Sequence, residues 1–213
     1  MQYGGLMGGI YKVSDVLMRL AYVNFLWIVG LLPGLVIFGV MPSTVALFNV
    51  VRSWLLEDDE LVIHRKFVAT YKKEFFKSNL LGLPILVIGY GLYINSQFLG
   101  VVNDGAFLTL AILICNILVA IVAGLFILYI FPVYVHFEMG LFQKVKLSVM
   151  LGITYPHITF ALVVILFLFA ALFMVVPALI FFFSASGITY CVMGIYLHKV
   201  NDIKDKYYSV KHA

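Results

Sequence analysis

The chain has 213 residues, of which 64% are hydrophobic and 11% charged, and its mean hydropathy is +1.09. Soluble domains carry about 25% charged residues, so this composition excludes a soluble globular domain and indicates an integral membrane protein. The net charge is +4. In a membrane protein such an excess of Lys and Arg usually lies in cytoplasmic loops, where it contacts anionic lipid. We therefore expect one all-α, polytopic membrane helical bundle whose partners include membrane lipids and exclude nucleic acid.

Residues 20–51 form a run without a charged side chain. One helix of that length would measure about 48 Å, well beyond the hydrocarbon core of about 30 Å. We predict a break at Pro33 and Gly34, with spans over about 15–31 and 43–56, the first capped by Ser14 and the second opened by Pro42. This hairpin either crosses fully or is short and re-entrant. Because its turn leaves backbone groups unsatisfied, we expect it to pack inside the bundle or against a partner.

Two later segments, residues 61–77 and 134–150, have amphipathic patterns typical of helices lying on a membrane surface. The first carries Lys66, Lys73 and Lys77 on one stripe, and we predict that these cations contact lipid or an acidic partner. The acidic residues 57–60 before it are expected to form an N-terminal turn.

Four further spans are predicted over about 80–99, 107–131, 158–182 and 187–198. Pro132 is expected to stop the second of these. The apolar run 157–198 is too long for one span. Its turn is placed at residues 184–187, with Pro177 as the other candidate break. The pattern S-x-x-L-G occurs at 78–82 and 148–152, which fits either a parallel repeat or a coincidence of small and apolar residues.

The distribution of charge predicts the orientation of these six crossings. With six crossings, all fourteen Lys and Arg residues fall on one side and Asp104 alone remains on the other. The positive-inside rule then places both termini in the cytoplasm of a multi-pass protein of the cell membrane.

Catalytic motifs are missing from the sequence. No H-E-x-x-H, P-loop, G-x-S-x-G or C-x-x-C pattern is present, and no Asp or Glu lies in the interior of a predicted span. We therefore expect no enzyme activity, no cofactor and no metal. Four amides lie nearest the membrane interior, where they either bond neighbouring helices or line a path for a small neutral solute. These are Asn24, Asn49, Asn95 and Asn116.

Short motifs in residues 20–82 carry a resemblance to a known family. They are Asn24-Phe25-Leu26-Trp27, Leu32-Pro33 and Pro42-Ser43-Thr44-Val45-Ala46-Leu47, followed by Phe67, Tyr71-Lys72, Phe75 and Ser78. Their order resembles the YesL-like family of bacterial integral membrane proteins, a family of unknown function. Glu74 stands where that family commonly has Asn.

The resemblance implies the process in which the protein takes part, but no reaction that it catalyses. Members of this family occur in Gram-positive bacteria beside genes for carbohydrate-binding lipoproteins, ABC importer permeases and glycoside-degrading enzymes. It therefore implies a non-enzymatic accessory subunit in oligosaccharide uptake, with ABC permease subunits as candidate partners. Glu138-Met139-Gly140 does not match the E-A-A loop with which such permeases engage their ATPase, so the chain is not expected to be the permease itself. A small neutral-solute transporter or channel is the alternative.

Overall fold

The computed structural model describes residues 6–56, 62–99 and 106–211, and the regular structure in these ranges is helical. Its elements are α1 (Leu6–Leu31), the 3₁₀ turn η1 (Leu32–Gly34), α2 (Ile37–Leu55), α3 (Ile63–Leu99), α4 (Ala106–His136), α5 (Leu141–Thr154), α6 (Pro156–Val175) and α7 (Leu179–Lys211). The predicted all-α class is confirmed. The predicted acidic turn at 57–60, residue 61 and Asp104 lie outside the described residues.

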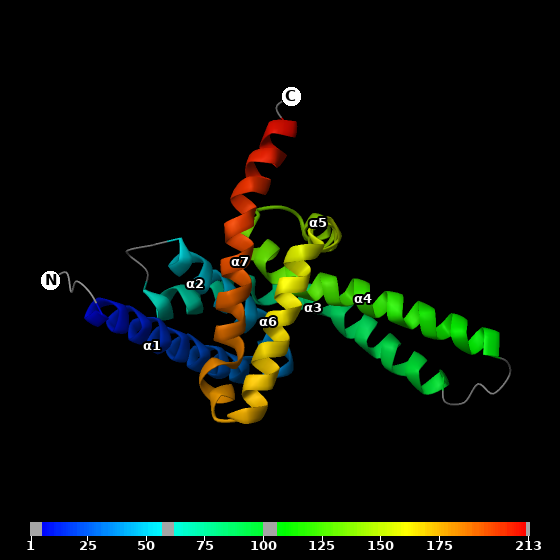
Figure 1. Ribbon diagram of the computed structural model, residues 1–213, viewed down its shortest axis with the longest axis horizontal. Helices are drawn as coiled ribbons and strands as arrows, with labels where there is room; N and C mark the ends of the chain where they lie inside the picture. The colour runs from blue at the N-terminus through cyan, green and yellow to red at the C-terminus, as the bar shows by residue number, and fades with distance from the viewer. Residues whose placement is uncertain (1–5, 57–61, 100–105, 212–213) are drawn as a thin grey trace.

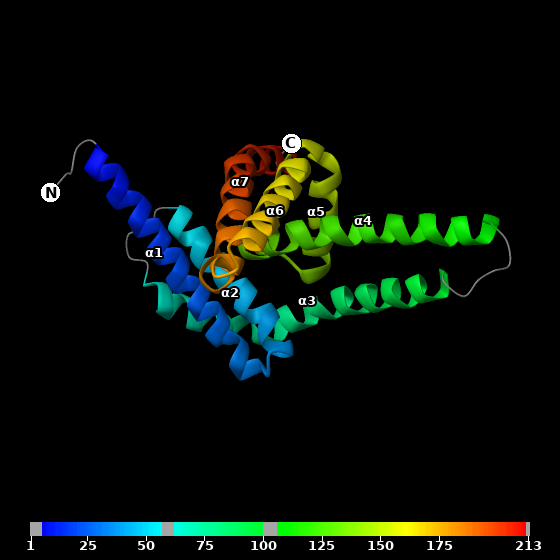
Figure 2. The same ribbon diagram turned by 60° about the horizontal axis from the view of Figure 1, so that its bottom comes forward.

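Consecutive helices pair into the hairpins α1–α2, α3–α4 and α6–α7 (Figure 1). The distal halves of α3 and α4 extend together as a long arm away from the other helices in both views (Figure 2). The short helix α5 joins α4 to α6. The hairpins meet at α2, which packs against α1, α3, α4 and α7.

Helix α2 is the interior element of the fold. Ten of its 19 residues are buried, and Val45, Ala46, Leu47, Val50 and Val51 are almost fully enclosed. The hydrophobic core around them includes residues of α1, α4 and α7. Burial of these aliphatic side chains therefore holds the three hairpins together.

Five helices are long and apolar enough to cross a membrane: α1, α3, α4, α6 and α7. Only 6% of the most apolar window of α4 and 11% of that of α6 is buried inside the protein. Exposed aliphatic and aromatic side chains on this scale require a hydrocarbon environment. The chain is therefore a multi-pass membrane protein. The predicted crossing at 43–56 corresponds to α2, which other helices cover.

The first hairpin begins and turns at places that differ from the prediction. Helix α1 starts at Leu6, so Ser14 lies inside the helix and does not cap it. Pro33 does end α1, but α2 begins at Ile37 and contains Pro42. The turn is tighter than expected because Leu35 and Val36 adopt positive φ angles of 50° and 66°.

Residues 61–77 were predicted as a surface helix separate from the span 80–99, and this separation is wrong. Helix α3 runs without a break from Ile63 to Leu99. The two polar residues at the expected boundary do not interrupt it, because the Ser78 hydroxyl and the Asn79 amide both donate to the Phe75 carbonyl, at 3.2 and 2.8 Å. Its N-terminal half packs on the interior of the protein, where Phe67 and Thr70 are buried.

The second predicted surface helix, 134–150, is also divided differently. Helix α4 continues past Pro132 to His136, residues 137–140 form a link, and α5 begins at Leu141. Gly140 is the N-cap of α5 in an extended conformation. Residues 134–136 therefore belong to a candidate membrane span, and only α5 is a short separate helix.

The last turn lies at Val176–Ala178, so the choice of residues 184–187 was wrong and Pro177 marks the break. The small residues at 184–187 lie inside α7. A Cβ on Gly187 would come within 2.9 Å of the Phe169 ring in α6, so this glycine permits close approach of two helices. The sequence pattern therefore marked a packing site rather than a turn.

Asn24 joins α1 to α7 at this same place. Its side chain is fully buried, its Nδ2 donates to the Phe181 carbonyl at 2.7 Å, and its Oδ1 accepts from the amides of Ala185 and Ser186 at 3.0 and 3.1 Å. In a regular helix Ala185 N–H would pair with Phe181 C=O. The Asn24 amide thus bonds both partners of one backbone pair of α7, and the predicted helix–helix role of this residue is confirmed.

The S-x-x-L-G segments share a local role, although neither begins a helix. Ser78 and Ser148 are both fully buried and bond carbonyls of the preceding turn. A Cβ on Gly82 would meet Met41, and one on Gly152 would meet Leu125. Each segment therefore combines a buried hydroxyl with a glycine contact to another helix.

We expect Asn24→Leu to lower the free energy of unfolding by about 1–3 kcal/mol, because it removes a fully buried amide and leaves three backbone groups of α7 without their side-chain partner. The measurement is unfolding of the detergent-solubilised protein followed by circular dichroism. Asn95→Leu is the matched control, since Asn95 is exposed, and its effect should stay within about 0.5 kcal/mol. Equal losses in the two variants would contradict the role assigned to Asn24.

The turn between α1 and α2 depends on Gly39. A Cβ there would lie 2.5 Å from the Leu31 carbonyl oxygen and 2.8 Å from Leu31 Cα. Because backbone atoms cannot move aside cheaply, we expect Gly39→Ala to destabilise the protein by about 1–3 kcal/mol in the same unfolding measurement. Gly89→Ala in α3, where a Cβ meets nothing within 4 Å, should be neutral or stabilising by up to about 1 kcal/mol. A neutral Gly39→Ala would refute the close contact.

Candidate functional site

The four asparagines singled out in the sequence do not lie along one passage. Asn24 is bonded to α7, and Asn49 donates to the Thr70 hydroxyl in α3 at 2.8 Å. Asn95 is exposed near the end of α3, and Asn116 is half-buried in α4. Of the four, Asn49 lines a cavity between α2 and α3.

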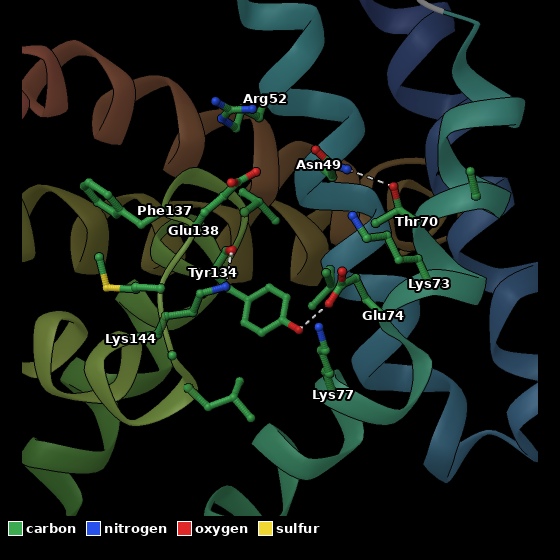
Figure 3. A pocket seen from close by; sticks show the side chains of 16 residues that line it. Asn49, Arg52, Thr70, Lys73, Glu74, Lys77, Tyr134, Phe137, Glu138 and Lys144 are labelled. Atoms are coloured by element: carbon green, nitrogen blue, oxygen red, sulfur yellow. Dashed lines mark hydrogen bonds between the residues drawn. The ribbon is translucent and has the colours of Figure 1, made fainter.

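That cavity has a volume of about 820 Å³ and lies between the C-terminal half of α2, the N-terminal half of α3, the end of α4 and the start of α5 (Figure 3). We call it the basic pocket. Charged and polar side chains from all of these elements line it. They are Asn49, Arg52, Thr70, Lys73, Glu74, Lys77, Tyr134, Glu138 and Lys144.

Helix α3 supplies one wall of the basic pocket. Thr70, Lys73, Glu74 and Lys77 recur at offsets of 0, 3, 4 and 7 residues, so they share one face of the helix. The Asn49–Thr70 hydrogen bond fixes this face against α2. Lys66 lies on the same stripe one turn earlier and does not line the pocket. Two of the three predicted contact lysines, Lys73 and Lys77, are therefore brought together at one site.

Tyr134 and Lys144 form the opposite wall. The Tyr134 hydroxyl donates to Glu74 Oε2 at 2.6 Å, which links α4 to α3. Lys144 Nζ donates to the Tyr134 carbonyl at 3.0 Å and lies 3.9 Å from the centroid of the Tyr134 ring. Only 9% of Lys144 is exposed. The ring and the carbonyl together stabilise this buried cation.

Burial has the largest effect on the pKa of Lys144. Desolvation lowers the pKa of its ammonium group below the ordinary value of lysine, and Lys77 lowers it further. The carboxylates of Glu74 and Glu138 act in the opposite direction. An anion placed in the pocket would favour the charged form of Lys144 in the same way.

Arg52 completes the ring of cations from α2. Its Nε donates to His136 Nδ1 at 3.3 Å, at the C-terminal end of α4. Within the described part of the chain, no ion pair involves Arg52, Lys73, Lys77 or Lys144. The four cations therefore face the cavity without a neutralising carboxylate in direct contact.

Sequence reasoning missed Arg52, Tyr134 and Lys144 as members of a site. Their chemistry was visible, but their positions in three different helices were not. The single available signal was Lys144 within an amphipathic pattern, and that pattern suggested a solvated face. Groups of three His, Cys, Asp or Glu that could hold a metal do not occur among the described residues.

Comparisons with known proteins agree with the motifs in residues 20–82. The family described as "Protein of unknown function, DUF624" matches residues 20–96, which include the C-terminal part of α1, all of α2 and nearly all of α3. No solved structure matches the chain.

Three relatives from Bacillus subtilis (strain 168) cover most of the chain. "Uncharacterized protein YteU" is 34% identical over 195 residues, 92% of this chain and 86% of that protein. "Uncharacterized protein YesV" is 29% identical over 188 residues, 88% of this chain and 87% of that protein. "Uncharacterized protein YesL" is 30% identical over 151 residues, 71% of this chain and 70% of that protein. The chain therefore belongs to the YesL-like family of integral membrane proteins of unknown function.

Proposed function

We propose that the protein is a non-enzymatic accessory subunit of a carbohydrate ABC importer in the cell membrane, where it supports assembly, stability or regulation. The setting in carbohydrate uptake is supported by the family resemblance. The structural observation that supports contact with a partner is the cluster of cations at the basic pocket. Because these cations lack ion-paired carboxylates within the described residues, they suit an acidic protein surface.

The orientation forms part of the proposal. The pocket cations lie at the ends of α2, α3 and α5 that the charge distribution assigns to the cytoplasmic side. With both termini also cytoplasmic, the pocket opens toward the ATPase and the cytoplasmic loops of a permease. Lys66, one turn from the pocket, extends the basic surface along α3.

We expect the triple variant Lys66→Gln, Lys73→Gln, Lys77→Gln to recover less importer permease from native membranes than the natural protein does. The difference should be large at about 0.05 M salt and small at about 0.5 M, because salt screens exposed charges. The amount of recovered permease is measured by affinity purification followed by identification of the bound proteins. The matched control removes three cations that are exposed and do not line the pocket, Lys12, Lys72 and Lys146.

Two results would count against this proposal. One is recovery of the same permease by the natural protein and the triple variant at both salt concentrations. The other is an equal loss in the control, which would indicate dependence on net charge rather than on this surface.

The position of Asn49 favours the alternative, transport of a small neutral solute, because its amide borders the basic pocket. If the protein transports such a solute, Asn49→Leu should reduce flux into liposomes at least about tenfold, since it removes a polar group from the path. Asn95→Leu is the control and should leave flux unchanged. Liposomes without flux for the natural protein would dismiss this alternative.

A further inference from the structure

The positive charge of the basic pocket comes from parts of the chain that are distant in sequence. Arg52 is in α2, Lys73 and Lys77 are one turn apart in α3, and Lys144 is in α5 (Figure 3). Four cations and two carboxylates line the cavity, which leaves a net charge of +2. One of the carboxylates, Glu74, is engaged by the Tyr134 hydroxyl. The fold therefore gathers more positive charge than the two carboxylates of the lining offset, and a bound anion would reduce the remaining repulsion between the cations.

Lys144 is the strongest indication that such an anion binds. An ammonium group has three donors, and the described contacts of Lys144 Nζ are one carbonyl and one aromatic ring. Buried charged donors are ordinarily satisfied, because an unsatisfied one is expensive. The wall formed by Lys144 therefore has hydrogen-bonding capacity left for a ligand.

The volume of the pocket and its uncharged walls indicate what the part of the ligand that carries no charge would be. A volume of about 820 Å³ is in the range of sites for organic ligands rather than for a bare ion. The Thr70 hydroxyl accepts from Asn49 and keeps its own proton to donate, and the Asn49 carbonyl oxygen keeps its capacity to accept. Val45 and Leu141 add apolar surface. These walls suit a body that carries hydroxyl groups on a short carbon chain or ring.

We propose that the basic pocket binds an organic phosphate, with the phosphate group held by Lys73, Lys77, Lys144 and Arg52 and the hydroxylated body lying along Asn49 and Thr70. A phosphate monoester carries a charge of about −1.5 to −2 at neutral pH, which complements the net charge of the lining. Lysine and arginine bind phosphate oxygens through strong, charge-assisted hydrogen bonds. This inference goes beyond the accessory function and does not depend on it.

The same chemistry has two sources, a soluble phosphate ester and the headgroup of an anionic phospholipid. The soluble arm titrates purified protein in neutral detergent with inorganic phosphate and with glycerol 1-phosphate by calorimetry. The lipid arm places the protein in nanodiscs of phosphatidylcholine with or without phosphatidylglycerol and measures retained phosphatidylglycerol by native mass spectrometry.

The test variant is Lys73→Gln, Lys77→Gln, whose side chains are exposed and lie outside the core. This double variant should bind whichever probe the natural protein binds at least about tenfold more weakly, since the loss of each charge-assisted contact weakens binding by about that factor. The matched control is Lys72→Gln, Lys146→Gln, which removes the same charge away from the pocket and should bind as the natural protein does. Lys144→Met, checked for folding by circular dichroism, should also lose binding.

Binding of glycerol 1-phosphate that the test variant loses assigns the site to soluble esters, and selective loss of phosphatidylglycerol assigns it to a headgroup. The proposal is overturned if no probe binds, or if the test and control variants weaken binding equally. Partner recovery from membranes, which tests the accessory function, uses no phosphate probe. The two proposals can therefore fail separately.

Discussion

The rest of the structure depends on the enclosure of α2. A membrane offers no water to the backbone, so a short helix that contains a proline and is preceded by two positive-φ residues needs protein around it. The hairpins meet on α2 and bury ten of its residues. This arrangement leaves the outer faces of α4 and α6 to the lipid and places α2 beside α3 and α4, with α5 packed on α4. The basic pocket lies between these four helices.

Polar groups in this apolar protein are used to join helices. The Asn24 amide bonds the backbone of α7, the Asn49 amide bonds Thr70, and the Tyr134 hydroxyl bonds Glu74. The Asn24 and Tyr134 contacts connect helices that are distant along the chain, and the Asn49 contact connects the consecutive helices α2 and α3. Because Asn49, Tyr134 and Glu74 also line the basic pocket, the contacts that fix the helices also shape the site.

Much of the fold was predictable from pattern alone. Hydropathy indicated the membrane class and most of the apolar helices, and Pro33 was correctly read as the end of the first helix. Two of the errors share one cause, because the polar residues 78–79 and the small residues 184–187 were read as boundaries. Ser78 and Asn79 satisfy their own side chains within α3, and residues 184–187 are bonded by Asn24 and packed by Phe169. The first compensation is local to α3, whereas the second cannot be seen without the neighbouring helices α1 and α6.

The sequence by itself determined that this is a helical membrane protein of the YesL-like family, because composition, apolar length and short motifs are properties of the chain read in order. It also identified Lys73, Lys77 and Asn49 as residues of interest. Only the tertiary structure decided that these three lie beside Arg52, Tyr134 and Lys144 around one cavity. The physical reason is that convergence depends on how α2, α3, α4 and α5 pack, and helical periodicity specifies a face but not the partner that the face will meet.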